Sequence, residues 1–152
     1  MPATSRRRLF HSIASSPGGT AGRLLAPPAL ERAHARMQAL APQARAEIQK
    51  AIAVIAAEAE VEQSIDAVLS LAHDIHSLAA GFGSAGPGVV AGEIRSYILN
   101  RPPSLQPDWS LLRLLAALLS RAFDSPDEAP VDVVSDQARA LVSWALARAP
   151  IA

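Results

Sequence analysis

One stretch of the sequence repeats apolar residues at alternating intervals of four and three positions. This spacing matches the 3.6-residue period of an α-helix and predicts a helix that is packed along a single face. Few other folds accommodate such a repeat, so the stretch is expected to be one element of a helical bundle. The residues of this apolar stripe are Val61, Ile65, Val68, Ala72, Ile75, Ala79 and Phe82.

The rest of the chain favours the same class of fold. Apolar residues make up 50% of the sequence and aromatic residues only 4%, and Ala and Leu dominate the apolar set. Such a composition suits close-packed helices better than a sheet. Proline and glycine divide the periodic segments, and Pro42 is expected to end the first of them. The predicted helices cover residues 29–40, 43–60, 61–80, 89–99, 105–123 and about 135–148.

Short connections between amphipathic helices favour antiparallel neighbours. The predicted fold is therefore all-α, an up-down helical bundle over residues 29–150 with one or two flanking helices. Residues 1–28 are rich in Arg, Ser, Gly and Pro without periodicity, which predicts a disordered tail. The predicted helix 105–123 carries leucines on almost all sides, at positions 111, 112, 114, 115, 118 and 119. It is expected to be the central helix or the face of a homodimer.

Charge and composition exclude several classes of function. The net charge is +0 and the pI about 6.9, so no overall field attracts nucleic acid or an anionic membrane. The chain has no cysteine, which excludes disulfides and thiolate chemistry. It also lacks the run of about 20 apolar residues that a membrane-spanning helix needs. The basic N-terminus is not followed by the apolar segment of a secretory signal, and a cytoplasmic location is expected.

One histidine, His73, lies in the helix predicted from the apolar stripe but off its packed face. At about 100° per residue, its side chain points roughly 120° from the centre of the stripe. The outer face around it carries short side chains, namely Asp66, Ser70, Ser77 and Ala80. Core packing does not account for an imidazole on such a shallow surface. The pattern predicts an exposed His73 that another molecule can approach.

The residues that follow His73 form a recognisable series. His76 stands three positions on, the small residues Ser77 and Ala79 stand four and six positions on, and Gly83 stands ten positions on. This series, within the run Ala72-His73-Asp74-Ile75, resembles the signature of histidine-containing phosphotransfer (HPt) proteins, in particular the small stand-alone type of alphaproteobacteria. The motif covers about a dozen residues, and the similar order of helices extends from about residue 30 to 148. Two positions depart from the usual signature, because His76 replaces a Lys or Arg and Ser77 replaces a Gly.

The resemblance implies a four-helix HPt-like core and a phosphoryl carrier in a two-component phosphorelay. His73 would be the phosphoacceptor, and Ser70, Ser77 and Ala80 would lie under the docked partner. His76, about 60° from the stripe centre, is the candidate for a phosphate contact when protonated. The expected partners are the receiver domain of a response regulator, which supplies Mg²⁺, and a histidine kinase. The chain has no nucleotide-binding motif of its own, so no enzymatic activity and no cofactor of its own are expected.

Other interpretations of the same residues stay open. His73 is also compatible with a solvent-facing residue without function, or with a degenerate HPt-like interaction module that binds its partner without accepting phosphate. His73 and His76 have a spacing usable for metal binding, but cysteine is absent and no further ligand pair stands out. No metal site is therefore predicted.

Overall fold

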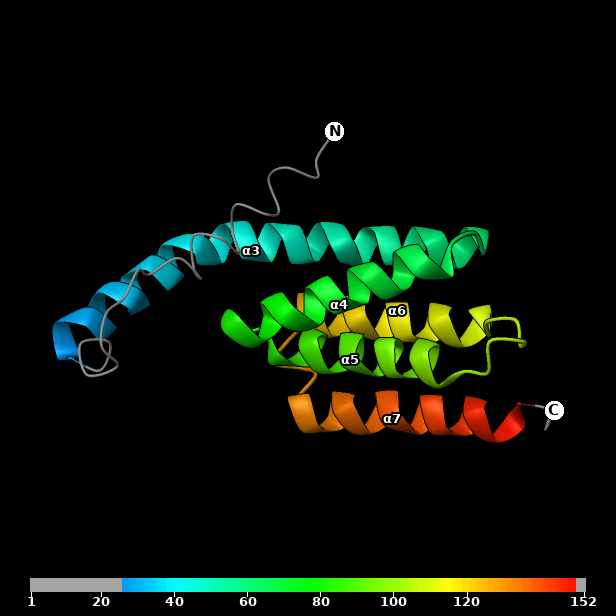
Figure 1. Ribbon diagram of the computed structural model, residues 1–152. Helices are drawn as coiled ribbons and strands as arrows, with labels where there is room; N and C mark the ends of the chain where they lie inside the picture. The colour runs from blue at the N-terminus through cyan, green and yellow to red at the C-terminus, as the bar shows by residue number, and fades with distance from the viewer. Residues whose placement is uncertain (1–25, 150–152) are drawn as a thin grey trace. The chain divides into compact units, whose positions relative to one another are not determined.

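A computed structural model describes residues 26–149 of the chain. This part contains helices and no strands, which confirms the predicted all-α fold with up-down packing (Figure 1). Residues 1–25, most of the predicted tail, lie outside the described residues, whereas Pro27 and Pro28 already belong to the first helix. The helices are α3 (Pro27–Val61), α4 (Ile65–Gly81), α5 (Ala85–Asn100), α6 (Trp109–Asp124) and α7 (Val131–Arg148).

The chain divides into two compact units between Ala39 and Leu40, within the length of α3. The described part of the first unit, residues 26–39, is helical from Pro27 and contains no buried residue. The second unit holds the hydrophobic core, whose first buried residue is Ala44.

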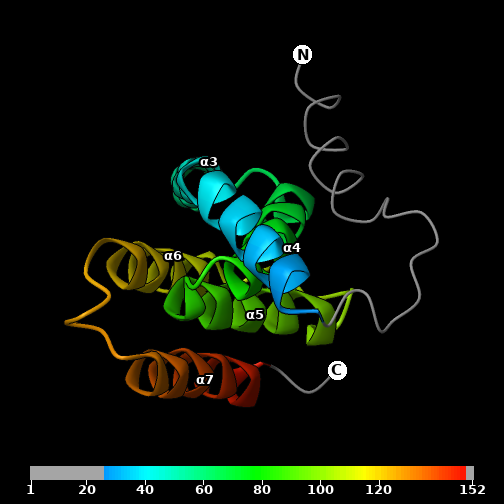
Figure 2. The same cartoon turned by 90° about the vertical axis from the view of Figure 1, so that its left-hand side faces the viewer.

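The core of the second unit is apolar throughout, because no polar or charged residue among those described is buried. Helix α5 packs against α4, α6 and α7, and both views place it between α4 and α7 (Figures 1 and 2). Burial of apolar side chains is therefore the main source of stability in this core. The largest fully buried side chains are Ile48, Ile55, Val68, Ile75, Val90, Ile94, Leu111, Leu112, Leu115, Leu119 and Val134.

The predicted break at Pro42 is wrong, because α3 continues through it. A proline inside a helix removes one backbone hydrogen bond and costs about 3 kcal/mol. Alanine and leucine surround Pro42 and favour the helix, and the buried residues Ala44, Ile48 and Ile52 follow at helical spacing. The burial of this face outweighs the lost hydrogen bond.

The apolar stripe is buried in its centre but not at its ends. Val68, Ala72, Ile75 and Ala79 are buried, as predicted, and Ile65 and Phe82 are half-buried. Val61, however, is 64% exposed, because it ends α3 and does not belong to the helix that carries His73. Glu62 then takes the left-handed conformation with a φ of 53°, which ends the helix and breaks its phase before α4 begins.

Three other predicted helix starts are displaced. Helix α5 begins at Ala85, not 89, because a proline such as Pro87 is tolerated in a first turn, whose N–H groups need no helical acceptor. Helix α6 begins after residue 108, not at 105, because the Asp108 carboxylate caps it by accepting from the Leu111 N–H at 3.0 Å. Helix α7 begins at Val131, directly after Pro130, and not near residue 135.

Helix α6 is not buried on all sides, as the distribution of its leucines had suggested. Leu114 is 52% exposed, whereas the other five leucines of the helix are buried. Arg113, next to it, reaches back to the α3–α4 corner, where it donates to the Ala59 carbonyl at 3.2 Å and pairs with Glu62 at 2.9 Å. One face of α6 therefore forms the core and another remains open.

Two serines at helix starts allow a matched test of capping. The Ser64 hydroxyl accepts from the Ala67 N–H at 3.2 Å at the start of α4, whereas Ser84, before α5, makes no such bond. We expect Ser64→Ala to lower the free energy of unfolding by about 1 kcal/mol. Ser84→Ala is the control and should have little effect in the same urea titration. Equal losses for the two variants would contradict the assigned role of Ser64.

Candidate functional site

The His73 side chain is exposed near the middle of α4. Its neighbour Ala72 is fully buried, so the helix turns its packed face toward the core and the imidazole toward solvent. The His73 ring makes no hydrogen bond with the rest of the described chain. These observations confirm the predicted exposure and leave both ring nitrogens of His73 open to a reactant.

The side chains around His73 project only a short distance from the helix. Ser70, Ser77 and Ala80 are exposed on the same helix, and all three have short side chains. The Ser77 hydroxyl donates to the His73 carbonyl at 2.9 Å, one turn back along the helix. This bond folds the hydroxyl onto its own helix, so Ser77 does not obstruct an approach to the imidazole. The three residues predicted to lie under a docked partner therefore share the exposed surface of α4 with His73.

His76 has a contact that the sequence did not predict. Its Nδ1 lies 2.9 Å from the carbonyl oxygen of Gly88 on α5. A carbonyl oxygen only accepts, so Nδ1 carries the proton of this hydrogen bond. A Cβ atom placed on Gly92, one turn further along α5, would lie 3.1 Å from Nδ1 and 3.3 Å from Cε1. The edge of the ring thus lies against the backbone of α5, although His76 as a residue is exposed.

The close approach of α5 depends on its glycines. A Cβ atom on Gly88 would lie 3.0 Å from the Cβ of Ala79, a distance that side chains hardly tolerate. Glycine at this position lets α5 pack near enough for its Gly88 carbonyl to meet His76. The spacing of Gly88 and Gly92, four residues apart on one helix, was the signal in the sequence for this contact.

Glu93 of α5 forms an ion pair of 3.8 Å with Arg139 of α7, so it links these two helices and has a partner away from α4. In the part of the chain that the structure describes, no group of three or more His, Cys, Asp or Glu side chains is placed to hold a metal ion. Among the same residues, no helix combines the length and the hydrophobicity of a membrane span.

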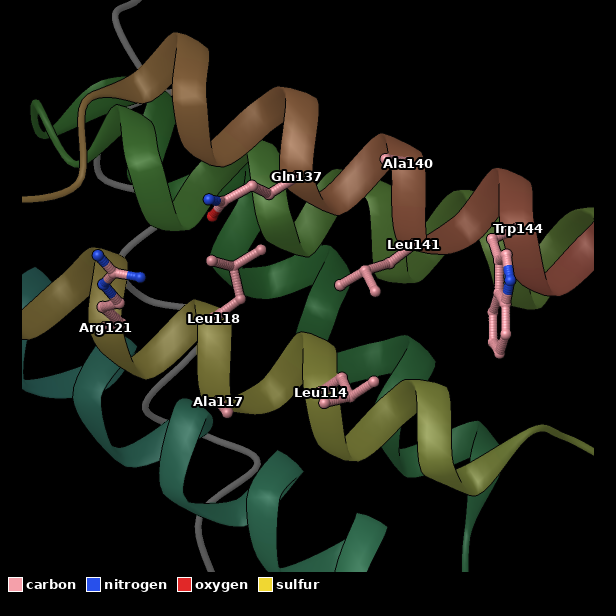
Figure 3. Close-up of a pocket in the computed structure, with 8 residues that line it drawn as sticks. All are labelled: Leu114, Ala117, Leu118, Arg121, Gln137, Ala140, Leu141 and Trp144. Carbon is pink, nitrogen blue, oxygen red and sulfur yellow. The ribbon is translucent and has the colours of Figure 1, made fainter.

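A second surface feature lies between α6 and α7 (Figure 3). It is an open groove of about 720 Å³ with mainly apolar walls. Leu114 and Trp144, from opposite walls, are 52% and 53% exposed, and the Arg148 guanidinium lies 4.4 Å from the centre of the Trp144 ring. The sequence pattern drew attention to the α6 leucines but not to Trp144. The residues that line the groove are Leu114, Ala117, Leu118, Arg121, Gln137, Ala140, Leu141 and Trp144.

Comparison of the chain with protein-family models, with curated proteins and with solved structures finds no match. Evidence for a function therefore comes from the geometry around His73 and His76 and from the resemblance of the motif to HPt proteins.

Proposed function

We propose that the protein is a histidine phosphotransfer protein, which carries a phosphoryl group on His73 to or from the receiver domain of a response regulator. The observation that carries this proposal is the exposed imidazole of His73 on a helix surface of short side chains. This surface suits the approach of a folded partner domain. The HPt-like motif and the helical bundle agree with the proposal, and a cytoplasmic location would accompany it.

Phosphoryl transfer requires few catalytic groups from the carrier protein. Phosphoryl transfer has a loose transition state, so positioning and charge neutralisation provide most of the catalysis. The unprotonated nitrogen of a neutral imidazole attacks the phosphorus of an aspartyl phosphate with its lone pair. The P–O bond to the aspartyl group breaks, and its electron pair leaves with the carboxylate. The receiver would supply the Asp and Mg²⁺, and the carrier contributes the outward-facing nitrogen.

The direct test is transfer from a receiver that carries labelled phosphate. We expect the label to move to His73. The phosphoramidate bond of the phosphohistidine would be labile in acid and stable in base. In a titration with the receiver, amide resonances should shift around Ser70, Ser77 and Ala80. A panel of receivers that neither transfers label nor shifts these resonances would overturn the proposal.

A bulky residue on the docking surface should block transfer without unfolding the bundle. We expect Ser77→Trp to slow transfer by roughly 100-fold, because displacement of a reacting group by about 1 Å has an effect of this size. Ser143→Trp is the matched control, since Ser143 is exposed on α7, away from α4. Thermal unfolding should be similar for both variants. Equal transfer rates for the two variants would show that the receiver docks elsewhere.

The groove between α6 and α7 favours one other function, that of an interaction module that binds a partner without accepting phosphate. Exposed apolar side chains such as Leu114 and Trp144 are typical of binding surfaces. In that case, the resonance shifts would be confined to α6 and α7, and His73 would remain unlabelled. The same titration therefore separates the two functions.

A further inference from the structure

We propose that His76 is a second phosphorylation site, at which Nε2 accepts a phosphoryl group while Nδ1 keeps its proton on the Gly88 carbonyl. The inference goes beyond the carrier role of His73, because His76 would accept the phosphoryl group from a small-molecule phosphodonor, without a docked receiver. The observation that carries it is the 2.9 Å hydrogen bond between His76 Nδ1 and Gly88 O.

This hydrogen bond selects the tautomer of His76. A neutral imidazole has one N–H and one nitrogen with a free lone pair, and the partner of one nitrogen decides the role of the other. With the proton held at Nδ1, the lone pair resides on Nε2. No other hydrogen bond of the His76 ring occurs within the described residues, and the residue is exposed. Nε2 is therefore presented as a nucleophile before any partner arrives.

The ring is also held in place. Gly92 brings the backbone of α5 against Nδ1 and Cε1, and a Cβ atom there would lie 3.1 Å from Nδ1. The contact with Gly88 and the contact with Gly92 lie one helical turn apart on the same side of α5. Together they orient the imidazole, which lowers the entropy that it loses when it reacts.

The transfer step balances without loss of a proton from the ring. With phosphoramidate as the donor, the Nε2 lone pair forms a bond to phosphorus while the P–N bond breaks. The amino group of the donor carries an extra proton and leaves as ammonia with the electron pair of that bond. The product ring has phosphate on Nε2 and a proton on Nδ1, so it carries positive charge, which the Gly88 carbonyl stabilises. For onward transfer, this ring leaves as a neutral imidazole, which is a good leaving group.

His34 provides a control within the same chain. It is exposed on α3, but its Nε2 lies 2.9 Å from the side-chain amide nitrogen of Gln38, which donates to it. The lone pair of His34 Nε2 is therefore engaged, whereas that of His76 Nε2 is open. Two exposed histidines of one protein thus differ in whether the Nε2 lone pair is free to react.

The test treats the full-length His73→Gln variant with phosphoramidate and locates the label by mass spectrometry and ³¹P NMR. We expect phosphate on Nε2 of His76, formed about 10-fold faster than on His34, which is the size of the effect that a hydrogen-bond partner has on the affinity of a histidine ligand. The doubly substituted variant, with His76→Gln added, should lose this label. Labelling of His76 at Nδ1, or no faster than His34, would overturn the proposal. Receiver-dependent labelling of His73 is a separate assay, so each proposal fails on its own result.

A second variant tests the support of the ring. Gly92→Ala places a Cβ atom against Nδ1 and Cε1 and should displace the ring from Gly88. We expect labelling of His76 to fall about 10-fold and labelling of His73 to stay unchanged. Circular dichroism checks that the variant folds. In the unsubstituted protein, ¹⁵N NMR of the ring should show a protonated Nδ1 and an unprotonated Nε2, and the opposite tautomer would also overturn the proposal.

Discussion

Replacement of His73 by Gln is expected to abolish phosphoryl transfer from a phosphorylated receiver. Removal of a reacting nucleophile lowers a rate by a factor of roughly 10³ or more. His73 is exposed and makes no hydrogen bond to the rest of the described chain, so the substitution should leave the thermal unfolding temperature unchanged. The measurement is the rate at which label leaves the receiver and reaches the carrier.

The control for this variant is His34→Gln. His34 is also an exposed helical histidine, but it lies in the other compact unit of the chain. Its substitution should leave the rate of transfer unchanged. Retention of full transfer by His73→Gln would refute the carrier role of His73. Loss of transfer together with loss of helical structure would show that His73 contributes to the fold, contrary to its exposed position.

The second large effect concerns stability. We expect Leu115→Ala to lower the free energy of unfolding by about 2–5 kcal/mol, because it removes a buried side chain and leaves a cavity in a tightly packed core. Leu115 is fully buried in α6, where the helix meets the rest of the core. A loss of this size is a large fraction of the total stability of a domain. Urea titration monitored by circular dichroism measures it.

Leu114→Ala is a closely matched control, because it makes the same substitution one position away in the same helix. Leu114 is 52% exposed, so its removal should cost less than 1 kcal/mol. A large loss for Leu114→Ala would mean that the α6–α7 groove is covered in solution, for example by a second copy of the chain. Sedimentation of the two variants would then differ, and the predicted homodimer would gain support.

Local periodicity was sufficient to predict the central part of α4. Val68, Ala72, Ile75 and Ala79 are buried and His73 is exposed, as the spacing indicated. The errors arose where a single residue was given too much weight. Pro42 removes one backbone hydrogen bond, but the burial of the part of α3 that follows it compensates for this loss. Val61 fits the period of α4, but Glu62 turns the chain out of the helical conformation directly after it.

The contact of His76 illustrates what periodicity does not contain. The angle of His76 around α4 placed it at the rim of the packed face, where either a solvent contact or an interhelical contact is possible. The choice depends on how near α5 approaches, and this distance is set by Gly88 and Gly92 on another helix. Sequence spacing within one helix does not report the separation of two helices. The α6–α7 groove was not predicted for the same reason. In the sequence, Trp144 looks like one more apolar residue of α7, and its exposure depends on the positions of the neighbouring helices.

The separation of His73 from the core has an evolutionary consequence. The buried residues that hold α4 in the bundle are apolar and lie on the opposite side of the helix from the imidazole. We therefore expect substitutions at His73 to have almost no energetic effect on the fold, so that selection for a stable protein does not act on this position. A lineage that no longer used the histidine would keep the bundle and lose the imidazole by drift. Retention of histidine at this position among descendants would consequently record selection on the function of this surface and not on stability.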